Sequence, residues 1–387
     1  MLLSDFTLMF SDKNAMNLEK LKHKFGESRM LDFIDALKTS FYHQVQLKDF
    51  KGEPIVFLPS KVNMSAQSLK VLSSTYGNKS YGIKAMEDEI FATLSIEQIA
   101  TSRESVRRIL GGAAPQGSNE NKAYGIKRGL DFIADAGNRI TAENLYALYM
   151  LAVGDFLEAD NKLLPGYQYR HDAVYVVGGE VSHQGLDFQL LSEYMSQLIK
   201  WIAEEDVLDQ IVKSMILHYY FAYIHPYFDG NGRMARLMQL WYLVQMGYTA
   251  ALFLPFSAHI NDSKKLYYKA FTQITENQKI IKALDTTPFL LFFVEEVIDQ
   301  LAKRAEPEKA ASVFEKMLSY GEITEKEKDL FYYVLSAYGT KEFSTKMLEK
   351  DYKDVAYATV RSFVLKLEAK GLLASQKYGG RVKYRIV

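Results

Sequence analysis

The chain has 387 residues, of which 48% are hydrophobic and 24% are charged, as in an ordinary globular protein of two or three domains. Lys+Arg and Asp+Glu both number 47, so no net charge directs the whole chain to nucleic acid or to a membrane surface. The absence of cysteine excludes disulfides and thiolate zinc sites, and it favours a reducing, cytoplasmic location.

Residues 1–85 form an N-terminal region of mixed pattern with few turn signals. Its first residues lack a basic stretch before the apolar ones, so we do not expect a signal peptide. Apolar residues then recur at helical spacing, and the overall fold is predicted to be mainly α. Helices are expected over residues 83–96, 102–110, 119–136, 142–153, 186–204 and 206–224.

The pattern changes between residues 167 and 184, where Tyr and Val alternate with polar residues around Gly178-Gly179. Such alternation around a glycine turn predicts a β-hairpin between two helices. Residues 237–261 contain no charged side chain, but Gln239, Gln245 and Pro255 interrupt them. We therefore expect two buried segments that break at Gly247, and no membrane span.

The C-terminal part is predicted to be a winged-helix domain over residues 321–387. A charged linker over residues 301–320 is expected to join it to the rest, and the alternative for its charged stretch is a solvated helix end. Three helices and a hairpin that turns at Gly379-Gly380 account for its pattern. Residues 355–387 contain seven Lys and Arg and one acid, a net charge of +6. Two interpretations stay open, namely DNA binding through residues 355–387 and a protein-docking or dimerisation module.

The most informative stretch is residues 224–236, Ile-His-Pro-Tyr-Phe-Asp-Gly-Asn-Gly-Arg-Met-Ala-Arg. Gly230 and Gly232 have no Cβ, so backbone N–H groups can converge on an anion at the start of the helix that follows. Arg233 and Arg236 are three residues apart on that helix and can both bind phosphate oxygens.

The same stretch also contains one candidate base and one candidate metal ligand. Histidine titrates nearest to neutral pH, so His225 is a candidate general base. Asp229 offers the hard oxygen atoms that Mg²⁺ prefers, usually together with substrate phosphates. The alternative interpretation is a glycine-rich turn between two buried helices, preceded by a core histidine.

Eight residues match the signature His-Pro-Phe-x-Asp/Glu-Gly-Asn-Gly-Arg-x-x-Arg, namely His225, Pro226, Asp229, Gly230, Asn231, Gly232, Arg233 and Arg236. By these residues the chain resembles the Fic family, over roughly residues 86–300. Tyr227 replaces the usual Phe of the signature. The resemblance implies a helical Fic domain, a hairpin flap near residues 167–184 that positions a target protein, and AMP transfer from ATP.

The resemblance also implies an inhibitory helix near residues 93–98. Many Fic proteins carry the pattern Ser/Thr-x-x-x-Glu-Gly/Asn, which Thr93 and Glu97 match, whereas Gln98 departs from it. A glutamate paired with Arg236 would occupy the arginine that should bind the ATP phosphates. We therefore expect Glu97 to inhibit the enzyme.

A third resemblance involves the helix after the signature. Tyr267 and Tyr268 match a pair that lines the nucleotide pocket in the family, and Ser263 replaces the usual Asn. Adjacent helical residues point about 100° apart, so we expect one tyrosine to face the nucleotide. His218 precedes His225 by seven residues and is interpreted as core packing, while His171 and His183 lie in or beside the predicted flap.

We predict a protein adenylyltransferase that uses ATP and Mg²⁺, with His225 as the base and Asp229 as the metal ligand. The expected acceptor is a Ser, Thr or Tyr hydroxyl of a protein docked at the flap, self-modification included. Three alternatives stay open: transfer of a different phosphate-linked group, removal of AMP, and a nucleotide-sensing DNA-binding regulator. A homodimer also stays open.

Overall fold

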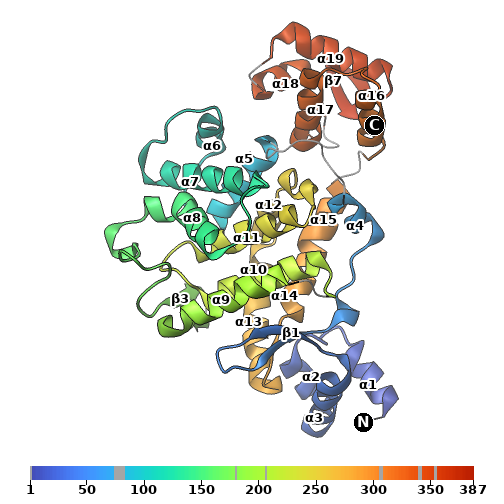
Figure 1. Cartoon of the computed structure of the whole chain (residues 1–387). Helices are drawn as coiled ribbons and strands as arrows, with labels where there is room; N and C mark the ends of the chain where they lie inside the picture. The colour runs from blue at the N-terminus through green and yellow to red at the C-terminus, as the bar shows by residue number, and fades with distance from the viewer. Residues whose placement is uncertain are drawn as a thin grey trace.

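The computed structural model describes residues 2–73, 83–178, 181–204, 207–304, 308–338, 342–352 and 355–387. Helices dominate these residues, and the strands form three small sheets (Figure 1). The predicted mainly α-helical fold is confirmed. Within the described ranges, no helix combines the length and the apolar character needed to cross a membrane.

The N-terminal region contains a helical cluster and a small sheet. Helices α1 (Leu3–Phe10), α2 (Leu18–Phe25) and α3 (Glu27–Ala36) share a core of their own around Phe6, Leu21 and Phe33. Strands β1 (His43–Lys48) and β2 (Pro54–Phe57) pair antiparallel, and β2 pairs in parallel with β5 (Leu284–Asp285). Helix α4 (Ala66–Leu72) follows.

The N-terminal region predicted over residues 1–85 contributes strands to the main core. Val45 and Leu47 of β1 and Ile55 and Phe57 of β2 lie in the main hydrophobic core. The partner of β2 is β5, which comes more than 200 residues later in the chain. Local sequence pattern cannot reveal such a long-range strand pairing.

Helices α5 to α15 build the main body. Their bounds are α5 (Ile83–Ile96), α6 (Arg103–Leu110), α7 (Gly117–Ala134), α8 (Ala142–Ala152), α9 (Leu191–Ala203), α10 (Gln210–Ile224), α11 (Asn231–Gln245), α12 (Phe256–Asp262), α13 (Lys264–Ile281), α14 (Thr287–Phe292) and α15 (Asp299–Arg304). The helices predicted between residues 83 and 224 are all present, with ends shifted by a few residues. Thr141 caps α8 as expected, because its side chain accepts from the Asn144 N–H.

The pair α10 and α11 is the centre of the body (Figure 1). Nearly every residue of both helices is buried, which explains the uncharged stretch after Arg236 without a membrane span. The expected break is present: α11 ends at Gln245, and Gly247 adopts a left-handed φ of 87°. The turn between α10 and α11 carries the signature residues, so the most buried helices of the molecule hold that turn.

The predicted hairpin is confirmed. Strands β3 (Tyr175–Gly178) and β4 (Val181–Gln184) pair antiparallel, with Tyr175 opposite Gln184. The hairpin leads into η5 (Phe188–Leu190) and α9.

The C-terminal unit has a separate core, the upper body in Figure 1. Helices α17 (Glu325–Tyr338), α18 (Thr345–Tyr352) and α19 (Tyr357–Ala369) precede a hairpin of β6 (Leu373–Tyr378) and β7 (Arg381–Ile386). Thr324 and Glu327 form a reciprocal capping box at the start of α17. This order of elements is the one expected of a winged helix.

The predicted linker over residues 301–320 is wrong. Residues 299–304 form α15, and Glu308–Ser319 form α16. Phe314 of α16 stacks on Phe331 at a centroid distance of 3.8 Å, so α16 belongs to the C-terminal core. The charged residues around Pro307 indicated a solvated connection, but the apolar face of α16 outweighs that signal.

Candidate functional site

The imidazole of His225 lies at the turn between α10 and α11. His225 ends α10 in a left-handed conformation, with φ of 58° and ψ of 62°. Non-glycine residues rarely adopt this conformation, and such strain concentrates at functional sites. Its Nδ1 atom is 3.2 Å from the Ala222 carbonyl oxygen, an acceptor, so Nδ1 carries the hydrogen. In this tautomer Nε2 has the lone pair that a general base needs.

The glycine turn leaves room that a side chain would fill. Gly230 has φ of 83°, and a Cβ there would lie 2.5 Å from Val153 Cγ1. A Cβ at Gly232 would lie 2.4 Å from the Glu97 carboxylate oxygen Oε1. Helix α11 begins at Asn231, so this carboxylate occupies the helix N-terminus, where backbone N–H groups attract an anion.

Asn231 and Tyr227 fix the shape of this turn. The Asn231 side chain accepts from the Tyr227 N–H at 2.9 Å and donates to the Tyr227 carbonyl at 2.8 Å. The Tyr227 ring stacks on Tyr149 at 3.5 Å, fully buried. Tyrosine therefore fills the position of the usual Phe, and the side-chain amide of Asn231 holds the backbone of the turn in place.

Asp229 and Arg233 form the outer edge of the turn. Asp229 Oδ1 accepts from the Gly230 N–H at 2.5 Å and from Arg233 Nη2 at 3.1 Å. The Asp229 side chain is 44% exposed, whereas that of Arg233 is 2% exposed. Among the described residues, Arg233 Nε is buried without a hydrogen-bond partner. A buried donor of this kind suits a ligand with oxygen atoms.

Arg236 joins the turn to α5, as the resemblance implied. Its Nε donates to Thr93 Oγ1 at 2.7 Å, and its Nη2 donates to Glu97 Oε1 at 2.6 Å. The arginine is fully buried, and in the described part of the chain its Nη1 has no hydrogen-bond partner. Burial opposes the charge of Arg236, but Glu97, Tyr267 and Tyr268 together raise the pKa of the guanidinium.

Gln98, which departs from the family pattern, adopts a left-handed φ of 58°. Glycine and asparagine are the residues that accept this conformation most readily, which gives a physical reason for the usual Gly or Asn. The chain thus reaches the same backbone geometry with a less suitable residue.

The two tyrosines of α13 point in different directions. Tyr267 is buried, and its hydroxyl lies 3.0 Å from His218 Nε2. Tyr268 is 42% exposed, and its hydroxyl donates to the Ile96 carbonyl at the end of α5 at 3.4 Å. Of the two, Tyr268 is the one accessible to a nucleotide.

Neighbouring residues of α13 also contact other elements. Ser263 donates to Glu296 at 2.6 Å, so this replacement of the family's Asn is engaged elsewhere. Lys264 Nζ donates to the Ser95 carbonyl at 3.3 Å. The start of α13 therefore contacts the C-terminal end of α5 directly.

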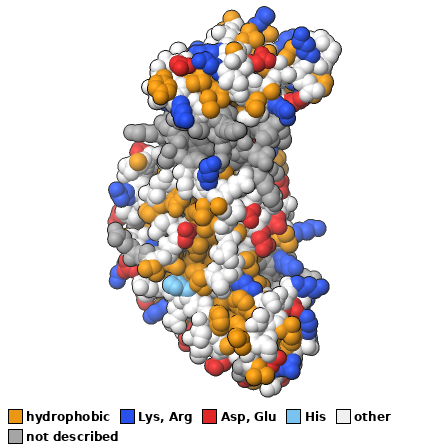
Figure 2. Space-filling model, turned by 90° about the vertical axis from the view of Figure 1, so that its right-hand side faces the viewer, with side chains coloured by type: hydrophobic (Ala, Val, Ile, Leu, Met, Phe, Trp, Pro, Cys, Tyr) orange, Lys and Arg blue, Asp and Glu red, His pale blue; other side chains and the backbone are white. Residues whose placement is uncertain are grey.

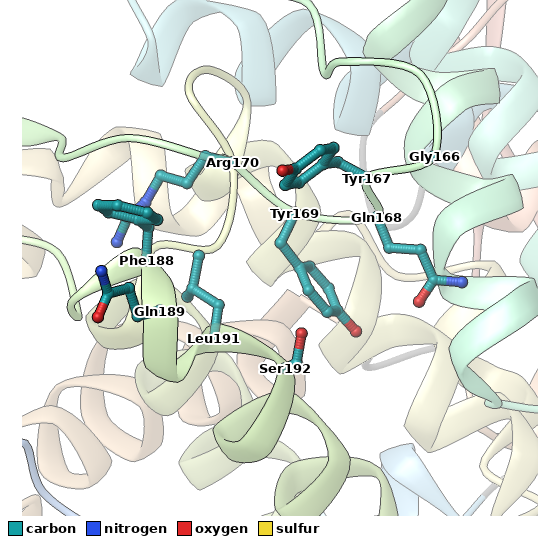
Figure 3. Close-up of a pocket in the computed structure, with 9 residues that line it drawn as sticks. All are labelled: Gly166, Tyr167, Gln168, Tyr169, Arg170, Phe188, Gln189, Leu191 and Ser192. Atoms are coloured by element: carbon teal, nitrogen blue, oxygen red, sulfur yellow. The ribbon is translucent and has the colours of Figure 1, made fainter.

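A cavity of about 450 Å³ lies beside the hairpin (Figure 3). Its walls come from the segment before β3, from η5 and from the start of α9: Gly166, Tyr167, Gln168, Tyr169, Arg170, Phe188, Gln189, Leu191 and Ser192. Arg170 connects this cavity to the turn, because its Nε donates to the His225 carbonyl at 2.9 Å. Its backbone N–H donates to the Pro226 carbonyl at 2.9 Å.

Sequence reasoning missed Arg170, Gln239 and Lys264 because their partners are distant in the chain. His171 lies beside the turn, 5.0 Å from the Phe228 ring, and the side chain of His183 lies outside the described residues.

Searching the described ranges gives no group of three or more His, Cys, Asp or Glu that could hold a metal. Asp229 alone fits an ion whose other ligands are phosphate oxygens and water.

Comparison with known proteins agrees with this geometry. The sequence pattern of the Fic/DOC family matches residues 139–243, from the segment before α8 into α11. Residues 139–243 therefore match a Fic/DOC domain.

Curated relatives match about a quarter of the chain. "Protein adenylyltransferase Fic" of Drosophila yakuba is 32% identical over 106 residues, 25% of this chain and 21% of that protein. The Drosophila melanogaster protein of the same name is 31% identical over the same shares. The chain thus matches about a fifth of the length of these relatives.

One solved structure is similar over a longer range. The structure of a Fic family protein from Desulfovibrio desulfuricans G20 matches 86% of this chain and 97% of its own, with a TM-score of 0.51. The sequence identity is 21%, so this likeness concerns the fold.

Proposed function

We propose that this protein transfers AMP from ATP to a hydroxyl side chain of a protein, and that Glu97 inhibits the reaction. The observation that carries the proposal is the shared turn, which holds the His225 imidazole and the N-terminus of α11 with its two buried arginines. The name of the Drosophila relatives, protein adenylyltransferase, supports the same reaction.

Each residue of the turn has a different role in such a reaction. Arg233 and Arg236 bind the outer phosphates of ATP, and the backbone N–H groups after Gly230 stabilise charge that develops on the α-phosphate. His225 Nε2 takes the proton from the acceptor hydroxyl. The hydroxyl oxygen forms a bond to the α-phosphorus, the bond to the bridging oxygen breaks, and pyrophosphate leaves.

Asp229 would hold Mg²⁺ together with the phosphates, because its half-exposed carboxylate lies at the edge of the turn. When bound there, Mg²⁺ neutralises negative charge on the phosphate oxygens. Tyr268 is proposed to line the nucleotide pocket and Tyr267 to support it. The target protein is proposed to dock at the hairpin by strand addition.

Glu97 inhibits by occupying the position of a phosphate. Its carboxylate lies against Gly232 and pairs with Arg236, the two features that an anionic phosphate would use. Removal of Glu97 should therefore free the arginine and open the helix N-terminus to ATP.

Incubation with α-labelled ATP and Mg²⁺ tests the proposal, with label on the protein as the readout. We expect Glu97→Gly to incorporate at least about tenfold more label than wild type, the equivalent of about 1.4 kcal/mol in the barrier. Glu97→Gln is the matched control that removes the charge while keeping the side-chain shape, and it should be activated as well. Glu97→Gly/His225→Ala should incorporate none; label in this double variant would refute the role of His225.

A further inference from the structure

Arg170 is a buried arginine in the segment before β3, and the proposed reaction does not use it. It lines the cavity of Figure 3, yet only 2% of the residue is exposed. Burial lowers the pKa of its guanidinium and outweighs the favourable charges of Asp187 and Asp172. A buried charge with such partial compensation is costly, so its other contacts must explain why the fold keeps an arginine here.

Each nitrogen of the Arg170 guanidinium donates to a backbone carbonyl. Nε donates to His225 at 2.9 Å, Nη1 donates to Asp172 at 2.6 Å, and Nη2 donates to Leu186. The backbone N–H of Arg170 donates to the Pro226 carbonyl at 2.9 Å. One residue therefore connects the turn between α10 and α11 with the segments that enter and leave the hairpin.

The end of the hairpin leaves room for this guanidinium. Gly185 follows β4, and a Cβ there would lie 2.8 Å from Arg170 Nη2 and 3.2 Å from His225 Cβ. The N–H of Leu186, the next residue, donates to the Ile224 carbonyl at the end of α10 at 3.1 Å. The end of β4, the guanidinium and the candidate base are therefore packed closely together.

These contacts act on the residue whose backbone is strained and whose ring is the candidate base. His225 has φ of 58°, a conformation that costs on the order of 1–3 kcal/mol and needs support from its surroundings. Arg170 binds the carbonyls of His225 and Pro226, so it fixes the two peptide groups that follow the imidazole. The ring then keeps Nδ1 at 3.2 Å from the Ala222 carbonyl, the contact that places the lone pair on Nε2.

We propose that Arg170 is a positioning residue, which holds the His225 base at a fixed place relative to the hairpin where the acceptor protein docks. The proposal rests on the proposed function. The contacts of Arg170 lie on the hairpin side of the turn, whereas Arg233 and Arg236, the proposed phosphate ligands, belong to α11. Loss of Arg170 should therefore slow transfer and leave ATP binding unchanged.

Single-turnover labelling with saturating α-labelled ATP and Mg²⁺ measures the transfer rate in the Glu97→Gly background. We expect Arg170→Met to slow transfer about 100-fold, the cost of misplacing a catalytic group by about 1 Å. Calorimetry on Glu97→Gly/His225→Ala, with and without Arg170→Met, should give ATP dissociation constants that agree within about twofold. Equal losses of rate and of ATP affinity, or an unchanged rate, would overturn the proposal.

Two further variants separate the fork of the guanidinium from its charge and from stability. Arg170→Lys keeps the charge, but one ammonium group cannot reach three carbonyls, so transfer should stay at least about tenfold slower. Full activity of Arg170→Lys would contradict the proposal, and this variant decides the matter if Arg170→Met does not fold. Lys213→Met is the matched control, because Lys213 is also buried and donates to a backbone carbonyl, that of Glu204, at 2.8 Å. It should lower the unfolding midpoint without slowing transfer; a comparable loss of rate would assign the effect of Arg170 to stability.

Nitrogen NMR of isotopically labelled histidine gives a readout that does not depend on transfer. The His225 signal, identified by its loss in His225→Ala, should report the Nδ1–H tautomer in Glu97→Gly and a mixture of tautomers once Arg170→Met is added. An unchanged tautomer would overturn the role of Arg170 even if transfer were slow. If Glu97→Gly transferred no label, the proposed function would fail, and this spectrum would still decide whether Arg170 holds the ring.

Discussion

Two non-glycine residues of the site, Gln98 and His225, share a left-handed backbone conformation with φ of 58°. Each costs on the order of 1–3 kcal/mol, which the surrounding structure must offset. His225 is held by the buried helix α10 and by Arg170, which donates to its carbonyl. Gln98 directly follows Glu97, the proposed inhibitory residue, so strain there acts on the position of Glu97.

Gln98→Gly should strengthen inhibition. Glycine adopts φ of 58° without steric cost, so the segment that carries Glu97 should be stabilised by about 1 kcal/mol. We expect label incorporation from ATP to fall several-fold below wild type and the unfolding midpoint to rise. Lys282→Gly is the matched control, since Lys282 has φ of 54° at the end of α13. It should raise the midpoint and leave transfer unchanged; equal inhibition by both variants would contradict the prediction.

Glu89 predicts a pH dependence of stability. Glu89 is buried on α5 and accepts from the Ser257 N–H at 2.8 Å and from the Ser257 hydroxyl. Burial raises its pKa from 4.5 to about 7, so the folded state favours the protonated form. A raised pKa means that the contribution of this group is complete below pH 4.5 and is lost as the pH rises to 7.

Glu89→Gln, which does not titrate, isolates this effect. Relative to the variant, the unfolding free energy of wild type should fall by up to about 3 kcal/mol between pH 4.5 and 7.5. Urea unfolding curves at several pH values measure the difference. Parallel pH profiles for the two proteins would show that Glu89 titrates normally.

At the scale of elements, α5 depends on α13 as well as on Arg236. Lys264 donates to the Ser95 carbonyl and Tyr268 to the Ile96 carbonyl, which are among the last carbonyls of α5. Such groups otherwise lack partners at a helix end, so cationic and hydroxyl donors stabilise them. Helix α13, which carries Tyr268, therefore also holds the C-terminal end of α5 in place.

Lys264→Met should release part of the inhibition. The substitution keeps the apolar stem but removes the donor to Ser95, so we expect α5 to loosen at its C-terminal end. Incorporation of label should rise a few-fold, to a level between wild type and Glu97→Gly. The exposed neighbour provides the control, since Lys265→Met should have no effect. A decrease in Lys264→Met would instead assign Lys264 chiefly to nucleotide binding.

The sequence predicted the helices and strands better than the contacts between them. The helical spacing of apolar residues and the capping residues predicted the helices between residues 83 and 224. The alternation of apolar and polar residues predicted the hairpin. Both signals are local in the sequence. The contact between Glu97 and Arg236 joins residues 139 positions apart, and only the family resemblance suggested it. Nothing local connects His218 with Gln239 and Tyr267, so packing a histidine in the core was the reasonable interpretation of an apolar helix.

At the scale of the whole molecule, the C-terminal unit contacts α5 at the end opposite Glu97. Helix α17 lies against α5 (Figure 1). Near that contact, Arg107 Nε donates to Glu87 of α5 at 2.9 Å, and the charge of Arg107 is close to Asp351 of α18. The two cores are therefore not independent bodies joined by a linker, as residues 301–320 had suggested.

The fold also reduces the positive charge that residues 355–387 offer to a ligand. Three of the seven basic side chains pair with acids from earlier in the unit: Lys366 with Glu327, Lys370 with Glu322, and Lys383 with Glu342. On the face seen in Figure 2, basic, acidic and hydrophobic side chains are mixed over this unit. The net charge of +6 counted from the sequence therefore overstates the charge available to DNA.

The salt dependence of DNA binding measures this charge. Four exposed basic residues remain, namely Arg361, Lys377, Arg381 and Arg385. If each neutralised one phosphate, the slope of log K against log salt would be about −4, with weak binding at physiological salt. Arg361→Ala/Arg381→Ala should reduce the slope by about 2, while Lys370→Ala, whose partner is Glu322, should not change it. A filter-binding titration measures the slope. A wild-type slope of about −6 would mean that the ion pairs open on DNA and that the unit is a dedicated DNA-binding module. A slope near −4, or no binding, favours a docking role.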